Sequence, residues 1–344
     1  MKKSLIAAAA MIITSAAYAD SVTIYGLIDE GYISSSTIDN GKKTNENGIV
    51  ANTSSTSRIG FKGQEDLGGG NKSNFVLEFG GNPNTGDGGQ VRQAYVALSN
   101  DSFGKFGIGR QQTFTYDTIM ATDASGISGL VGSISHNRIK DLDRANSVSY
   151  SIGNEYVGLN GAYSVSNASS SDQTGQASGG LHAYEVGANA RYGMFSVNAG
   201  YTNAKVAGTG SSEPFGIRVS GALNAKTIYA NAGYDFGILK ANYSYYAPTV
   251  DAAVAVANAS VTPFVKAQFH QLGLSTPITP SVDLFGNYLV AKVDSGVYGE
   301  TGNGYQAGAR YTLSKRTNIY AGYGKQQLGS YKESAYTVGL KHTF

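Results

Sequence analysis

Alternation of apolar and polar residues over stretches of about ten positions, repeated along the chain, most limits what this sequence can fold into. The stretch 184–192 places Tyr, Val and Ala at every second position, with Glu, Gly, Asn and Arg between them, and 305–312 does the same. Successive side chains of a β-strand point to opposite faces, so the pattern predicts strands with one apolar and one polar face. Gly, Asn, Asp and Ser interrupt these stretches, as turn residues do.

The apolar face of these strands is rich in Ala and carries Tyr near its ends, in a chain with 24 Tyr and no Trp. A soluble β-sandwich would fill its core with bulky Val, Ile, Leu and Phe side chains. Tyr at both ends of a short apolar stretch is typical of the aromatic girdles at membrane–water interfaces. The opposite face is rich in charged and amide side chains, as a water-filled lumen requires. The pattern therefore favours an all-β transmembrane barrel over a soluble sandwich.

The alternating stretches number sixteen, an even count that fits closure of an antiparallel barrel around an aqueous channel. They lie near 21–33, 52–66, 71–81, 90–99, 104–111, 146–153, 156–165, 182–193, 194–206, 225–236, 237–248, 264–277, 279–293, 302–314, 315–328 and 332–344. Short turns alternate with long connections near 34–51, 112–145, 166–181, 207–224 and 249–263. Short turns on one rim and long loops on the other are the outer-membrane arrangement.

The first residues have the pattern of a secretory signal peptide. Lys2 and Lys3 precede the apolar stretch 5–13, and Ala17-Tyr18-Ala19 is a small-x-small cleavage site. We expect a signal peptide over 1–19 and a single barrel domain over 20–344. The chain has 26 basic and 24 acidic residues, and two of the basic ones lie in this leader, so the mature balance is neutral. A nucleic-acid partner would need a basic excess and is not expected.

Residues that carry enzymatic chemistry are scarce. There is no Cys, and the four His residues are scattered. The stretch 68–73 reads GGGNKS, which lacks the glycine before Lys that a phosphate loop needs, and is interpreted as a hairpin turn. No G-x-S-x-G elbow occurs, and no Asp-x-Asp-x-Asp spacing supports a calcium site. We expect no catalysis, no cofactor and no metal, with a Ser–His hydrolase in the barrel wall as a distant alternative.

Several ordered motifs cover the mature chain from end to end. They are SVTIYG at 21–26, SRIGFKGQEDLG at 57–68, RQAYVAL at 92–98, FGIGRQ at 106–111, RANSVSY at 144–150, YTLSKRTNIY at 311–320 and HTF at 342–344. In this order they resemble the trimeric general porins of Gram-negative bacteria, in their β-proteobacterial form. Each motif alone is weak, whereas the ordered set is specific.

The resemblance implies a sixteen-stranded trimeric channel whose third long loop, near 112–143, folds inward and narrows the lumen. It also implies a basic wall that faces acids on this loop. Matched by motif, the basic wall is Arg58, Lys62, Arg92, Arg110 and Arg144, and the acids are Asp117 and Asp123. These basic residues could also serve only to brace the loop through salt bridges.

Alternation supports part of this assignment independently. It places Arg58 and Lys62 on one face and Ile59 and Phe61 on the lipid face. For Arg92 it does not help, because Ala94 and Val96 share its parity. The loop tip, 126–132, reads GISGLVG and lacks the acid that many relatives carry, which predicts a weaker negative side of the pore.

These features predict an outer-membrane channel for passive diffusion of small hydrophilic solutes and ions, with a weak preference for anions. The alternatives are a substrate-specific barrel channel and, more distantly, a barrel enzyme or an adhesin. The expected partners are two further copies in a homotrimer, outer-membrane lipid and lipopolysaccharide. The barrel-assembly machinery is expected to read the last strand, whose Val338, Leu340 and terminal Phe344 share one face.

Overall fold

The computed structural model describes residues 21–166, 181–206, 223–252, 254–256, 259–261, 264–294 and 299–344. The expected signal peptide, 1–19, lies outside the described residues, and its cleavage stays a prediction. No helix in the described part of the chain is long and apolar enough to cross a membrane.

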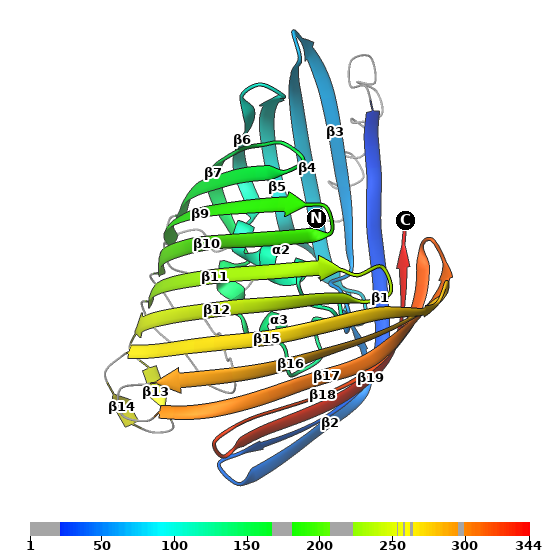
Figure 1. The fold of residues 1–344 in the computed structure, drawn as a ribbon, viewed down its shortest axis with the longest axis vertical. Coiled ribbons are helices and arrows are strands. Elements are labelled where there is room, and N and C mark those ends of the chain that lie inside the picture. Colours follow the sequence, from blue (N-terminus) through cyan, green and yellow to red (C-terminus); the bar gives the residue numbers. More distant parts are fainter. Residues whose placement is uncertain are drawn as a thin grey trace.

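One antiparallel sheet forms the wall of the protein, and it closes on itself (Figure 1). Its strands are β1 (Ser21–Asp39), β2 (Lys42–Ala51), β3 (Arg58–Gly68), β4 (Asn71–Asn82), β5 (Asp87–Asn100), β6 (Gly104–Gln112), β7 (Arg144–Gly153), β8 (Val157–Ser166), β9 (Leu181–Tyr192), β10 (Phe195–Val206), β11 (Leu223–Asp235), β12 (Lys240–Ala252), β15 (Phe264–Thr279), β16 (Val282–Asp294), β17 (Gly299–Ser314), β18 (Thr317–Leu328) and β19 (Tyr331–Thr343). A short separate hairpin, β13 (Val254–Val256) with β14 (Ala259–Val261), lies between β12 and β15.

The barrel has sixteen strands because β2 and β3 are two parts of one strand. The same edge of β1 pairs with β2 through 30–39 and with β3 through 21–27. Its other edge pairs with β19, from Leu27 opposite Thr343 to Ile38 opposite Lys332, and this pairing closes the barrel. The predicted all-β, sixteen-stranded antiparallel barrel is confirmed.

The prediction of a long loop over 34–51 is wrong. β1 continues to Asp39 and returns as β2 through a tight turn at Asn40 and Gly41, both with positive φ. An Asn-Gly pair with positive φ at both residues is the favoured two-residue turn of a hairpin. The run of Ser at 34–36 and the polar residues that follow resemble a loop in sequence. The irregular segment is instead 52–57, so the second predicted strand begins at Arg58 rather than at 52.

The two faces of the wall follow the predicted alternation. On β9, Tyr184, Val186 and Tyr192 are exposed on the outer surface, whereas Glu185 between them is only 6% exposed. On β1, Val22, Ile24 and Ile28 are exposed in the same way. Because the outer surface of a membrane barrel meets lipid, these exposed apolar side chains are favourably placed there.

The connection between β6 and β7, residues 113–143, lies inside the barrel, and we call it the inner loop (Figure 1). It contains α2 (Phe114–Ala121), α3 (Ile134–Asn137) and a short 3₁₀ turn (Lys140–Leu142). Its buried Ile119, Ile134 and Ile139 pack against a wall cluster that includes Tyr246 and Phe269. Burial of each such side chain contributes about 1.5–3 kcal/mol. The infolded third loop is therefore a packed element of the fold.

Candidate functional site

The entrance of the inner loop is fixed by an acid on the barrel wall. The carboxylate of Glu185 on β9 accepts hydrogen bonds from the backbone N–H groups of Phe114 (2.8 Å) and Thr115 (2.6 Å). Thr113 caps the same helix, because its hydroxyl accepts from the N–H of Tyr116 at 3.2 Å. A carboxylate at a helix N-terminus satisfies otherwise unpaired N–H groups and complements the helix dipole. Glu185 therefore anchors the loop rather than facing the lumen as a free charge.

The second half of the loop is held by buried amide side chains of the wall. Gln271 on β15 accepts from the N–H of Ile134 at 2.7 Å, and Gln326 on β18 accepts from the N–H of Gly132 at 3.2 Å. Gln306 on β17 donates to the carbonyl of Leu130. Each of these amides is at most 2% exposed. Displacement of the loop would leave these buried amide groups without hydrogen-bond partners. The three glutamines therefore fix the position of the loop.

Asp123 does not face the lumen, which corrects the prediction made from the sequence. Its carboxylate is 8% exposed and accepts from Ser125 (N–H at 2.9 Å, hydroxyl at 2.6 Å), from Asn287 at 2.8 Å, and from Ser135. A carboxylate surrounded by donors keeps its charge without lining the pore. Asp123 therefore connects two parts of the inner loop, at Ser125 and Ser135, and connects the loop to Asn287 on β16.

The loop tip, 126–132, lies against the wall. Ile127, Leu130 and Val131 are nearly fully buried and pack with Phe285 and Tyr320. The tip is also bonded to segment 52–57, where the carbonyl of Thr53 accepts from the N–H of Gly129 and that of Ser54 accepts from the N–H of Ser128, both at 3.1 Å. An acid in this apolar contact would have to be desolvated. This gives a physical reason for the absence of an acid from the tip, which the sequence analysis had noted.

Arg58 and Arg92 meet at one acid. Glu78 on β4 accepts from Nε of Arg92 at 2.7 Å, and its other oxygen lies 3.6 Å from Nε of Arg58. The hydroxyl of Tyr25 also donates to Glu78, at 3.0 Å. Two guanidinium groups around one carboxylate leave a net positive charge at this part of the wall. The sequence analysis did not single out Glu78, although its place between Leu77 and Phe79 puts it on the polar face.

A β-bulge explains why simple alternation could not place Arg92. The pairing of β4 with β5 shifts there, since Glu78 lies opposite Gln93 whereas Phe79 lies opposite Val91. An extra residue resets the faces of a strand, so Arg92 turns inward while Val96 is exposed on the outer surface. A Cβ atom at Gly80 would lie 2.4 Å from Cδ of Arg92. Glycine at position 80 thus makes the room that this arginine occupies.

Lys62 on β3 and Arg110 on β6 also belong to the predicted basic wall, and their surroundings differ from those of Arg58 and Arg92. Lys62 is exposed, and its ammonium lies 5.4 Å from the centre of the Tyr25 ring, which favours a cation. Arg110 on β6 is half-buried, and its Nε donates to the carbonyl of Val91 at 2.9 Å. Arg110 therefore links β6 to the neighbouring strand β5.

Arg144, the first residue of β7, lies beside an aromatic ring of the inner loop. Its guanidinium carbon is 4.9 Å from the centre of the Tyr116 ring, and that of Arg138 is 5.2 Å from the same centre. Arg138 is neutralised by Asp143, with contacts of 2.8 and 2.6 Å. Nε and Nη2 of Arg144 are buried and have no hydrogen-bond partner among the described residues. The positive charge of Arg144 thus interacts with an aromatic ring rather than with a carboxylate.

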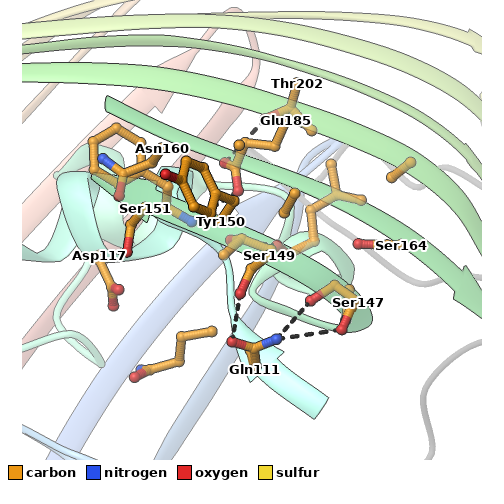
Figure 2. Close-up of a pocket in the computed structure, with 18 of the residues that line it drawn as sticks. Gln111, Asp117, Ser147, Ser149, Tyr150, Ser151, Asn160, Ser164, Glu185 and Thr202 are labelled. Atoms are coloured by element: carbon orange, nitrogen blue, oxygen red, sulfur yellow. Dashed lines mark hydrogen bonds between the residues drawn. The ribbon is translucent and has the colours of Figure 1, made fainter. Parts of the chain in front are cut away.

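Asp117, the other predicted acid, lies on α2 of the inner loop. Its side chain is exposed and lines an open pocket between the inner loop and the strands β6–β9 (Figure 2). Protein surrounds this carboxyl inside the barrel, and the resulting desolvation, together with the nearby charge of Glu185, raises its pKa to about 6. The charge of Arg144 lowers it in part. The pKa of Asp117 thus lies closer to neutrality than that of an ordinary aspartate, and its role in the pore stays a prediction.

Two further basic residues of the inner wall were not singled out from the sequence. Arg310 on β17 donates to the carbonyl of Ser125 at 2.9 Å, and Nζ of Lys341 on β19 lies within 3.4 Å of the hydroxyls of Ser54 and Ser55. Arg310 lies between Ala309 and Tyr311, so alternation alone could have placed it inward, whereas Lys341 lies between Leu340 and His342 and has an apolar neighbour on one side only. They hold the inner loop and segment 52–57 against the wall.

The comparisons with known proteins agree with this architecture. A profile described as Gram-negative porin matches residues 5–329. Similar proteins include the major outer membrane protein P.IB of Neisseria meningitidis serogroup B, 30% identical, and an outer membrane porin protein of Bordetella pertussis, 29% identical, each over the full length of both chains. Outer membrane porin protein 32 of Delftia acidovorans is 27% identical, again over both full lengths.

Solved structures show the same fold. The anion-selective porin from Comamonas acidovorans superposes with a TM-score of 0.75 at 21% identity, covering 94% of this chain and 99% of that one. The trimer form of OmpT of Vibrio cholerae gives a TM-score of 0.70 at 15% identity, covering 94% and 99%. With the closed barrel, these relatives place the chain in the outer membrane as a multi-pass β-barrel. The chain belongs to the Gram-negative porin family.

Proposed function

We propose that this porin is a passive diffusion channel for small hydrophilic solutes and ions. The observation that carries the proposal is the anchored inner loop, which narrows the barrel from within. The loop is fastened to β9 and to β15–β18, while the five side chains of the predicted basic wall lie on β3, β5, β6 and β7. A fixed obstacle facing a charged wall sets a size limit and acts on passing ions, with no moving part required.

We further propose a weak preference for anions. Four acids near the passage are already engaged: Glu78 by two arginines, Glu185 by backbone N–H groups, Asp123 by hydroxyl and amide donors, and Asp143 by Arg138. Arg144 and the exposed Lys62 have no acid within salt-bridge distance in the described part of the chain. Charges along a narrow, partly desolvated path act more strongly than charges on a rim. One structural neighbour is named an anion-selective porin, which supports this reading.

The proposed assembly is a homotrimer in outer-membrane lipid and lipopolysaccharide, inserted by the barrel-assembly machinery through the last strand. The exposed apolar side chains of Val22, Ile24 and Ile28 on β1 offer a flat contact for a neighbouring copy. A trimer form exists for one structural neighbour. The proposal assigns no catalysis and no cofactor, and the relatives named above are porins.

A planar-bilayer recording tests the proposal. Purified protein should insert in events of three equal conductance steps, and a salt gradient should give a reversal potential that indicates weak anion preference. A clearly cation-selective channel would overturn the proposed selectivity. Absence of conductance would overturn the channel itself and favour the adhesin or enzyme alternatives, whereas strong preference for one solute would favour a substrate-specific channel.

A further inference from the structure

Several hydroxyl and amide side chains lie on the inner face of β6–β8, beside small apolar residues. On β7, Ser147, Ser149 and Ser151 face inward, whereas Val148 and Tyr150 between them are exposed on the outer surface. Neighbouring strands add side chains of the same kind: Gln111, Gln112, Asn160 and Ser164. Together with Asp117 and Phe114 of the inner loop they line a pocket of about 160 Å³ (Figure 2).

The hydrogen-bonding groups of this pocket are only partly satisfied by the protein. Gln111 is held in place, since its amide donates to Ser147 at 3.3 Å and its oxygen accepts from Ser149 at 2.9 Å. Ser164 is 5% exposed, and its hydroxyl has no hydrogen-bond partner within the described ranges. In Figure 2 this hydroxyl points into the space that Ser147 and Ser149 also border. Because this hydroxyl borders the open space of the pocket, it can pair with water or with a solute.

The charges around the pocket have both signs, which favours a neutral solute over an ion of either sign. Of its ionisable groups, Glu185 is engaged by the helix N-terminus, and the ammonium of Lys105 lies over the Tyr95 ring at 5.1 Å. Asp117 remains as an exposed carboxylate acceptor. It disfavours anions, while hydroxyl and amide side chains, which both donate and accept, would be left unsatisfied by an apolar solute.

A polyhydroxylated molecule matches these groups, because neighbouring hydroxyls can donate to a carboxylate and exchange hydrogen bonds with serines and amides. The pocket is small, about 160 Å³, so a solute with a single sugar ring is the first candidate.

We propose that the inner face of β6–β9, with Asp117 opposite, is a binding subsite for neutral polyhydroxylated solutes of monosaccharide size. The inference rests on the proposed diffusion function and adds a solute class to it. Binding at an open site of this kind is weak enough for the solute to leave again, so the subsite raises its local concentration without blocking the passage.

The test is a titration of single channels with D-glucose in a planar bilayer. Glucose should reduce the ion conductance in a saturable manner, beyond its effect on viscosity. Triethylene glycol, which has a similar mass but no adjacent hydroxyls, should reduce conductance only in proportion to viscosity. Equal saturation by both solutes, or saturation by neither, would overturn the subsite.

Two variants and a matched control locate the binding. Ser164→Val removes the unpaired hydroxyl, and Asp117→Asn removes the charged acceptor; each should weaken apparent glucose affinity by about fivefold or more. Ser196→Val makes the same change on the inner face of β10, outside the pocket, and should leave the affinity unchanged. Equal affinities in Ser164→Val and Ser196→Val would refute the assignment. Ion conductance in each variant shows that the barrel has folded, and conductance without glucose saturation refutes the subsite while leaving the diffusion channel intact.

Discussion

Asn287 on β16 donates a hydrogen bond of 2.8 Å to the buried carboxylate of Asp123, and this contact joins the barrel wall to the middle of the inner loop. The two residues are 164 positions apart in the chain. Ser125 and Ser135 donate to the same carboxylate from within the loop. One acid thus fixes both the internal shape of the loop and its place in the lumen.

Asp123→Ala should therefore loosen the inner loop. Each buried donor left without its acceptor costs about 1–3 kcal/mol. We expect larger current noise, a higher mean conductance and faster cleavage of the loop by protease, with the strand signal in circular dichroism unchanged. Asp101→Ala, at an exposed turn, is the matched control and should behave as the parent protein. Identical noise and protease resistance in both variants would contradict the anchoring role.

Because Arg58 and Arg92 share Glu78, we expect substitution of an arginine and substitution of the acid to shift the reversal potential in opposite directions. Arg92→Ser removes one positive charge and should shift the reversal potential toward cations and raise the size limit. Glu78→Gln removes the shared acid and should shift it toward anions. Lys325→Ser changes a residue on the outer face of β18 and should do neither. Shifts of the same sign in Arg92→Ser and Glu78→Gln would contradict the electrostatic model of the wall.

Most strands could be predicted from the sequence to within a few residues, because side chains that alternate between lipid and water also alternate between apolar and polar along the sequence. For example, the predicted strand 194–206 is observed as Phe195–Val206. The bulge at Arg92 and the hairpin at Asn40-Gly41 were missed, since each depends on the register of a neighbouring strand. The direction of Asp123 could not be predicted at all. It is set by donors 12 and 164 residues away, which only the folded chain brings together.

The raised pKa of Asp117 predicts a pH-dependent selectivity. Its pKa of about 6 lies above the ordinary value of an aspartate, so the carboxyl is ionised at pH 7.5 and protonated at pH 5. Lowering the pH through 6 removes one negative charge from the lumen, and the anion-to-cation permeability ratio should rise. In Asp117→Asn the charge is already absent, so most of this rise should disappear.

A second titratable group on the inner loop requires its own control. Nε2 of His136 lies 3.7 Å from the carboxylate of Glu333. His136→Gln should keep the pH dependence if Asp117 is its main source. A selectivity step that survives in Asp117→Asn and is lost in His136→Gln would assign the effect to the histidine.

The last residue of the chain should be decisive for assembly. The N–H and carbonyl of Phe344 exchange hydrogen bonds with the carbonyl and N–H of Gly26, at 3.0 and 3.1 Å, so this residue completes the closure between the two ends of the barrel. Its ring lies against Gly26, where a Cβ atom would be 2.5 Å from the ring carbon Cζ.

Deletion of Phe344 removes the backbone pair and the apolar contact together, and should lower the yield of heat-modifiable barrel in the outer membrane severely. Phe344→Tyr keeps both and should assemble nearly as well as the parent, whereas Gly26→Ala should reduce the yield by crowding the ring. Equal yields from the deletion and from Phe344→Tyr would show that closure at this residue is dispensable.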